Sequence, residues 1–178
     1  MANAIYDSSS AVMLSGETSV GKYPIETVSM MKRVAVQAEE SFDYRAFYDK
    51  NRPISFSDVS TSVAAAAVQT TYAAEAKAIF AFTRSGATAR MLSRFRPKVP
   101  IIALTPLEKT YHELAIEWGV LPLRAEGDLS LQEAIEFTTQ FALQKRLVKS
   151  GDLVVITTGS PFWIQGSTNA LIVEKVKT

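Results

Sequence analysis

The sequence contains no cysteine and a single histidine, His112. These counts exclude disulfide bonds, thiol nucleophiles, cysteine metal sites and multi-histidine metal centres. The absence of cysteine is compatible with a reducing compartment, and we expect a cytoplasmic location. No apolar run approaches the about 20 residues of a membrane span. Residues 1–7 also lack the basic and apolar pattern of a secretory signal. We therefore expect no membrane partner.

An excess of charge of either sign is also missing. The 178 residues include 19 Lys+Arg and 18 Asp+Glu, and the formal net charge is +1. This balance argues against a domain that binds nucleic acid through bulk charge, and we expect no nucleic-acid partner. The length fits one compact domain, or one domain with part of another.

Residues 1–42 have the pattern of one strand followed by one helix. Ala11–Leu14 form a short apolar run typical of a buried parallel strand. From Pro24 to about Glu40, apolar residues recur at helical spacing. A lone strand cannot bury both of its faces, so we interpret this segment as the end of a larger α/β structure.

Residues 43–178 alternate strands with helices, which predicts a mostly parallel sheet covered on both faces. Pro122 indicates that one strand lies near an edge of the sheet. About a dozen residues without helical pattern precede the last strand, so that strand is predicted to run antiparallel. Ser57 or Asp58 is a candidate helix cap. The predicted strands are Ala78–Phe82, Pro100–Leu104, Val120–Leu123, Leu153–Thr157 and Ala170–Val176, and the main predicted helices are Val59–Glu75, Ala87–Phe95, Leu107–Trp118 and Leu129–Lys149.

The sharpest candidate site is the turn between the first of these strands and its helix. Ligands of open parallel sheets bind beyond the carboxyl ends of strands, and a helix N-terminus favours anions. Hydroxyl groups, a glycine and an arginine in this turn suit a phosphate. A capped turn without a ligand remains an equal alternative. The candidate residues are Thr83, Arg84, Ser85, Gly86, Ala87 and Thr88.

A second candidate is the long polar loop between the last two strands, which carries Phe162 and Trp163. Aromatic residues in such a loop can cover a ligand, but the residues alone favour local packing. The basic residues Arg90, Arg94, Arg96 and Lys98 are interpreted as a solvated helix face, with steering of an anion or contact with another subunit as alternatives. His112 is expected on the surface of its helix.

Several motifs together resemble the pyruvate kinase family. MLSGET followed by GKYP resembles the end of that family's catalytic barrel, and FTRSGATARMLSRFRP, PIIALTP, GDLVVITTG and GSTNALIV follow in the family's order. The resemblance covers the whole chain. It implies that residues 1–42 are the last strand and helix of a TIM barrel. It implies that residues 43–178 are the complete C-terminal domain, a three-layer α/β/α unit with a five-stranded sheet whose last strand is antiparallel.

The resemblance also implies a regulatory role in glycolysis. In members activated by fructose 1,6-bisphosphate, a loop aligned with Thr83–Thr88 binds an effector phosphate. A second effector loop matches here at Gly159, Gly166, Ser167 and Thr168, whereas Phe162 and Trp163 depart from it, so AMP and sugar monophosphates are alternative effectors. The family also forms tetramers through this domain, so a homo-oligomer is expected.

The family's catalytic lysine and the carboxylates that bind Mg²⁺, together with its usual K⁺ requirement, belong to the sequence upstream of Met1 in the resemblance. We assign no catalytic residue, metal ligand or cofactor to this chain, and expect no kinase activity from it alone. A stand-alone phosphometabolite-binding or interaction module is the alternative. A small phosphate-processing enzyme ranks last, since the chain offers no credible base or metal cluster.

Overall fold

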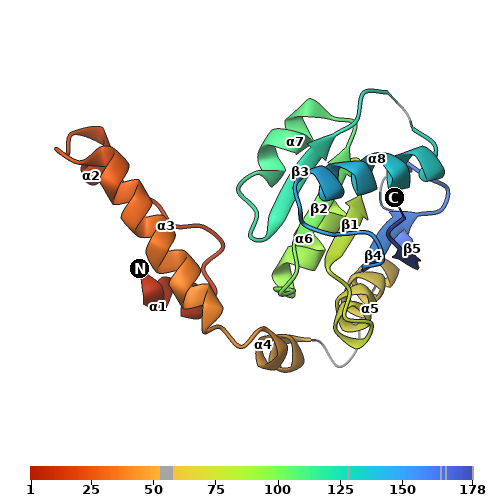
Figure 1. Ribbon diagram of the computed structural model, residues 1–178, viewed down its shortest axis with the longest axis horizontal. Coiled ribbons are helices and arrows are strands. Elements are labelled where there is room, and N and C mark those ends of the chain that lie inside the picture. The colour runs from red at the N-terminus through yellow and green to blue at the C-terminus, as the bar shows by residue number, and fades with distance from the viewer. Residues whose placement is uncertain (53–57, 128, 165, 167, 178) are drawn as a thin grey trace. The chain divides into compact units, whose positions relative to one another are not determined.

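The computed structural model describes residues 1–52, 58–127, 129–164, 166 and 168–177 (Figure 1). By its internal contacts the chain divides into two units, Met1–Asp43 and Tyr44–Thr178. The candidate cap Ser57 and the loop residue Ser167 lie outside the described residues.

The first unit is helical. It contains α1 (Ala2–Tyr6), α2 (Gly16–Ser19) and α3 (Pro24–Glu40), and both short helices pack against α3. Pro24 occupies the first turn of α3, where its missing N–H has no helical partner to lose. The strand predicted at Ala11–Leu14 was wrong, because these residues are irregular. No strand forms anywhere within residues 1–43, all of which are described. Residues 11–14 therefore have no neighbouring strand with which to form backbone hydrogen bonds.

The second unit contains a five-stranded sheet in the order β3-β2-β1-β4-β5. Only the β4–β5 pair is antiparallel, so the predicted fold class is confirmed. Pro122 lies in the edge strand β3, as predicted. The strands are β1 (Ala78–Phe82), β2 (Ile101–Thr105), β3 (Val120–Arg124), β4 (Leu153–Gly159) and β5 (Thr168–Lys175); the helices are α4 (Tyr44–Asn51), α5 (Val59–Ala73), α6 (Ala87–Arg94), α7 (Glu108–Leu114) and α8 (Leu131–Gln144).

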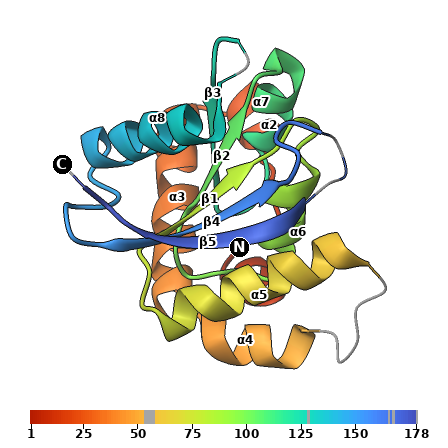
Figure 2. The same ribbon diagram turned by 90° about the vertical axis from the view of Figure 1, so that its right-hand side faces the viewer.

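Two hydrophobic cores lie on opposite faces of this sheet. One joins α5 and α6 to side chains such as Ile79 and Ile101, and the other joins α8 to Phe80 and Ile102. Successive strand residues thus alternate between the cores, because side chains alternate across a sheet. Figure 2 shows α8 on one face and α5 on the other. Ala64 and Ala67 are fully buried in α5, where small side chains let the helix lie close to the sheet.

The topology brings the two candidate loops to one edge of the sheet. β1 and β4 are parallel neighbours, with Ala81 opposite Thr157. The turn after β1 and the loop after β4 therefore leave the sheet side by side. β5 returns antiparallel and places Thr168 opposite Gly159, so both ends of the second loop are fixed by sheet pairing.

Candidate functional site

The two candidate loops line one small cavity of about 60 Å³. Gly86, one of the six residues predicted in the first loop, is the N-cap residue of α6 and does not line the cavity. Phe82 of β1, Ser60 of α5 and Met91 of α6 also line the cavity. The first loop contributes Thr83, Arg84, Ser85, Ala87 and Thr88, and the second contributes Gly159, Trp163, Ile164, Gly166 and Thr168.

The backbone of the first loop turns sharply at Gly86. This residue has a φ of 82°, in the left-handed region that glycine adopts readily. Its N–H donates to Thr83 Oγ1 at 3.0 Å. As the N-cap residue of α6, Gly86 has no side chain with which to cap the helix. The positive end of the helix dipole lies at this turn, where it favours an anion.

The carbonyl groups of the same loop are held by residues outside the cavity lining. Arg84 O accepts hydrogen bonds from Thr105 Oγ1 at 3.3 Å and from Thr110 Oγ1 at 3.0 Å. Ser85 O accepts one from Arg90 Nη1 at 2.9 Å. Both carbonyl oxygens thus accept hydrogen bonds from residues that do not line the cavity. Their partial negative charges are held by these donors and do not face the position that an anion would take.

A pair of buried hydroxyl groups joins the two loops. Thr88 Oγ1 and Thr168 Oγ1 are 2.6 Å apart, although they are eighty positions apart in sequence. The Asn169 side chain accepts from Ser160 N at 2.8 Å and donates to Ser160 O at 2.9 Å. The threonine pair thus joins the two loops, whereas the two Asn169 bonds close the base of the second loop on itself.

The aromatic residues of the second loop pack locally and also border the cavity. The Phe162 ring meets Phe82 edge-on, with 5.8 Å between centroids. Trp163 Nε1 donates to Leu129 O at 2.8 Å, and its ring lies 4.5 Å from that of Phe162. Both side chains are half-buried. The local packing of Phe162 and Trp163 that we predicted from the sequence is therefore observed. Trp163 also lines the cavity.

The interpretation of the basic residues as a solvated helix face was wrong for two of them. Arg94 and Lys98 are exposed, but Arg96 is only 5% exposed and its guanidinium lies 4.7 Å from the Trp118 ring centroid. Arg90 is half-buried and paired with two glutamates. The charge pattern alone did not reveal these partners, because they come from a later part of the chain. His112 is exposed on α7, as expected.

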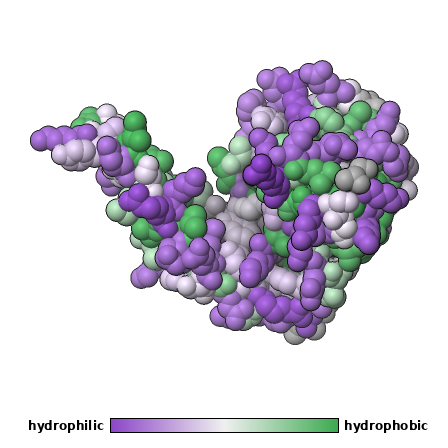
Figure 3. Space-filling view, in the orientation of Figure 1, coloured by the Kyte–Doolittle hydropathy of each residue, from purple (hydrophilic) through white to green (hydrophobic). Residues whose placement is uncertain are grey.

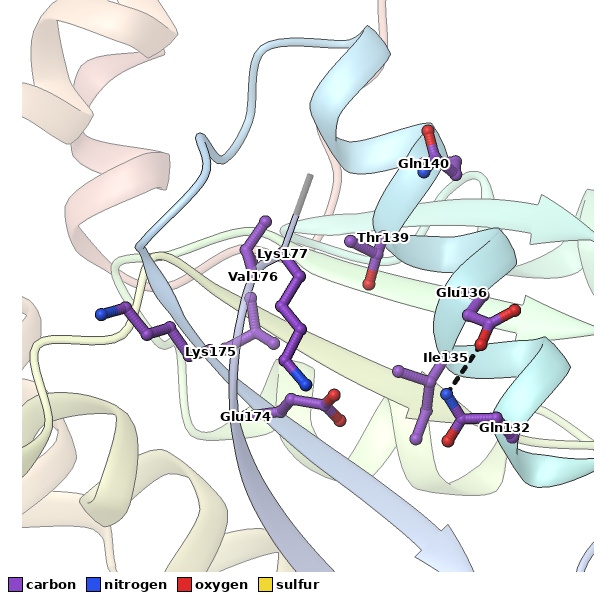
Figure 4. Close-up of a pocket in the computed structure, with 10 residues that line it drawn as sticks. Gln132, Ile135, Glu136, Thr139, Gln140, Glu174, Lys175, Val176 and Lys177 are labelled. Atoms are coloured by element: carbon purple, nitrogen blue, oxygen red, sulfur yellow. Dashed lines mark hydrogen bonds between the residues drawn. The ribbon is translucent and has the colours of Figure 1, made fainter.

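A larger cleft of about 460 Å³ lies between α8 and the end of β5. Figure 4 shows Gln132, Glu136 and Gln140 along α8, facing Glu174 and Lys177. Gln132 Nε2 donates to Glu136 Oε1 at 2.8 Å. The cleft mixes charges of both signs, and none of the candidate residues lines it. It therefore lacks the convergent donors that distinguish the smaller cavity.

The first unit carries an apolar groove of about 790 Å³, bordered by Met13, Leu14, Met30 and Val34. Figure 3 shows apolar residues exposed along this unit. Over the described ranges, no group of three His, Asp or Glu side chains is placed to hold a metal ion. No described helix is long and apolar enough to cross a membrane.

Comparison with known proteins relates the chain to one family. Residues 61–174 match the family described as pyruvate kinase, alpha/beta domain. The pyruvate kinase of Clostridium acetobutylicum is 39% identical over 177 residues, which cover 99% of this chain and 37% of the relative. That of Agrobacterium vitis is 40% identical over 171 residues, covering 96% of this chain and 36% of the relative.

Solved structures agree with this relationship. The crystal structure of a pyruvate kinase from Cryptosporidium parvum superposes with a TM-score of 0.91 and 31% sequence identity, over 99% of this chain and 35% of that one. A second crystal structure of Cryptosporidium parvum pyruvate kinase gives a TM-score of 0.87 at 30% identity. The chain spans 35–37% of the length of the Clostridium, Agrobacterium and first Cryptosporidium proteins.

Proposed function

Because the chain belongs to the pyruvate kinase family, in which it corresponds to the C-terminal α/β domain, we propose that it binds a phosphorylated effector in the cavity between its two candidate loops. The observation that carries the proposal is the convergence of Thr83–Thr88 and the β4–β5 loop on one cavity at the N-terminus of α6. This arrangement gathers donors from two distant parts of the sequence.

The groups around the cavity suit a phosphoryl group. Amide groups at the start of α6 and the hydroxyl groups of Thr83, Ser85 and Thr88 are donors to its oxygens, and the Arg84 guanidinium supplies positive charge. A cavity of about 60 Å³ is far smaller than the roughly 300–1,000 Å³ of sites that enclose whole ligands. The phosphate therefore enters the cavity, and the remainder of the effector lies outside it.

The proposed effectors are fructose 1,6-bisphosphate, AMP and a sugar monophosphate such as ribose 5-phosphate. They share the phosphoryl group and differ in the remainder of the molecule, which would lie beside Trp163 and Ile164. Their relative affinities thus report on the second loop, whereas binding of any of them reports on the first.

We further propose that the chain acts as the regulatory domain of a cytoplasmic glycolytic enzyme that transfers phosphate from phosphoenolpyruvate to ADP. In this proposal the Mg²⁺ and K⁺ ions and the catalytic groups belong to the remainder of such an enzyme, because the described part of the chain offers no three-ligand metal cluster. Subunit contacts are part of the proposal. They are supported by β5, which forms an edge of the sheet and exposes Val173.

Calorimetric titration of the purified chain with the three effectors tests effector binding. We expect at least one to bind, and Arg84→Glu to abolish the heat because a carboxylate repels phosphate. Arg94→Glu is the matched control, since it makes the same charge change at an exposed position of α6. Absence of binding by all three compounds, or equal losses in the two variants, would contradict the proposal.

A further inference from the structure

The Arg90 side chain, on α6, bonds to three separate segments of the described chain. Its Nη1 donates to Ser85 O at 2.9 Å, its Nη2 to Glu113 Oε2 at 3.0 Å and its Nε to Glu117 Oε1 at 3.0 Å. Glu113 belongs to α7 and Glu117 to the turn before β3. The planar guanidinium is thus fixed by two carboxylates while it holds a carbonyl of the candidate loop.

The same guanidinium also packs against the turn of that loop. A Cβ atom added to Gly86 would lie 2.8 Å from Arg90 Nη1. Arg90 itself does not line the cavity. Its charge is balanced by Glu113 and Glu117, so it contributes little net attraction for an anion. Its contacts indicate instead that Arg90 fixes the backbone conformation at Ser85 and Gly86.

We propose that Arg90 is a positioning residue for the phosphate site, an inference that rests on the proposed function. By holding the Ser85 carbonyl outside the cavity, Arg90 keeps the peptide units of Ser85 and Gly86 in the orientation in which α6 presents its first N–H groups to the phosphate. Glu113 and Glu117 act through Arg90: they fix its rotamer. A change in the conformation of α7 or of the turn before β3 would therefore change the affinity of the cavity for phosphate.

Substitutions of the partner carboxylate separate positioning from simple electrostatics, because the two predict opposite signs. Glu117→Gln removes a negative charge near the site, so electrostatics alone would tighten anion binding. Positioning predicts weaker binding, since Arg90 exchanges a charged carboxylate partner for the weaker, neutral acceptor of an amide oxygen. Glu108→Gln is the control, because it removes a carboxylate of α7 that lies near His112, pairs with Arg124 and has no contact with Arg90 among the described residues. We expect binding of ribose 5-phosphate and inorganic phosphate to weaken several-fold in Glu117→Gln and to change less than twofold in the control.

Arg90→Gln and Arg94→Gln form a second matched pair, since each removes one positive charge from α6. We expect Arg90→Gln to weaken phosphate binding by about tenfold and Arg94→Gln by less than twofold. Arg90→Lys keeps the positive charge but lacks the planar guanidinium that bonds to three partners at once. We therefore expect it to weaken phosphate binding about as much as Arg90→Gln does. Equal effects of the two glutamine variants, together with tighter binding in Glu117→Gln, would overturn the positioning role.

Hydrogen exchange gives a readout that needs no ligand. The Gly86 N–H is bonded to Thr83 Oγ1, and its exchange, measured by NMR, should accelerate in Arg90→Gln but not in Arg94→Gln. If the wild-type chain binds no phosphate compound, the proposed function fails, and Gly86 exchange still decides the role of Arg90. Unchanged exchange in Arg90→Gln would overturn the inference even if the wild-type chain binds phosphate.

Discussion

At the scale of single residues, the geometry of the cavity depends on the backbone conformation of Gly86. Its φ of 82° is costly for a residue with a side chain, and its neighbours leave no room for one. Besides Arg90, the Leu114 side chain lies 3.2 Å from the position of an added Cβ. Leu114 is fully buried, so it has little freedom to move.

We predict that Gly86→Ala destabilises the fold by about 1–3 kcal/mol and weakens phosphate binding, because the new methyl group displaces Arg90. Gly119→Ala is the matched control: Gly119 has a φ of 70° and nothing within 4 Å of an added Cβ. Urea denaturation should show a smaller loss for Gly119→Ala, since only the backbone cost applies there. Equal losses in the two variants would show that the contacts with Arg90 and Leu114 do not matter.

At the scale of helices and strands, α5 begins at a carboxylate cap. Asp58 accepts hydrogen bonds from Thr61 N at 2.8 Å and from Thr61 Oγ1 at 2.7 Å. The Thr61 N–H foremost, and then its hydroxyl, lower the pKa of the Asp58 carboxyl from its ordinary value. The contribution of this cap is therefore complete above the unfolded-state pKa of about 3.9 and is lost as the pH falls through the lower pKa of the folded state.

This linkage predicts that wild-type stability falls more steeply between pH 6 and pH 3 than that of Asp58→Asn. Asparagine also caps helices but does not titrate in this range. Asp58→Ala should be less stable than wild type at pH 6 because it removes the cap. Urea denaturation of the three proteins at both pH values provides the measurement. Identical pH dependence in wild type and Asp58→Asn would show that the carboxylate does not contribute as its bonds indicate.

The elements that the sequence predicted well are those whose signals are local. β1 was predicted at its observed bounds, since Ala78–Phe82 is an apolar run between polar turns. The prediction of a strand at Ala11–Leu14 was wrong, because a strand also needs a neighbouring strand to pair with, and an apolar run does not reveal whether one is present. The turn at Thr83–Thr88 was found from its residue types. The role of Arg90 was missed because its partners, Glu113 and Glu117, are brought to it only by the fold.

At the scale of the whole chain, the proposed regulatory role predicts that these 178 residues by themselves do not transfer phosphate. The chain spans 37% of the Clostridium relative, and the described residues hold no three-ligand metal cluster. Phosphoryl transfer depends on positioned cations. We expect no conversion of phosphoenolpyruvate and ADP to pyruvate and ATP by the purified chain, measured by coupling pyruvate formation to NADH oxidation. Turnover at a rate proportional to the concentration of the chain would contradict this expectation.

The two units differ in how their apolar residues are covered. Both hydrophobic cores draw only on residues from 48 to 176, within the second unit. In the first unit, Met13 is 86% exposed and Ile25 is 77% exposed. An exposed apolar surface of this kind favours association or aggregation. The second unit therefore has the hydrophobic cores that independent folding requires, whereas the first unit contains neither of them.

We accordingly predict that a shortened chain of residues 44–178 folds by itself and binds the same phosphorylated effector with unchanged affinity, because every residue of the candidate cavity lies within it. The full chain should self-associate more strongly than the shortened one, since only the full chain carries the exposed groove. Circular dichroism during heating tests folding, and sedimentation velocity over a range of concentrations tests association. If Met13→Glu, within that groove, left the association of the full chain unchanged, the contacts would have to come from the second unit, where β5 offers an open edge.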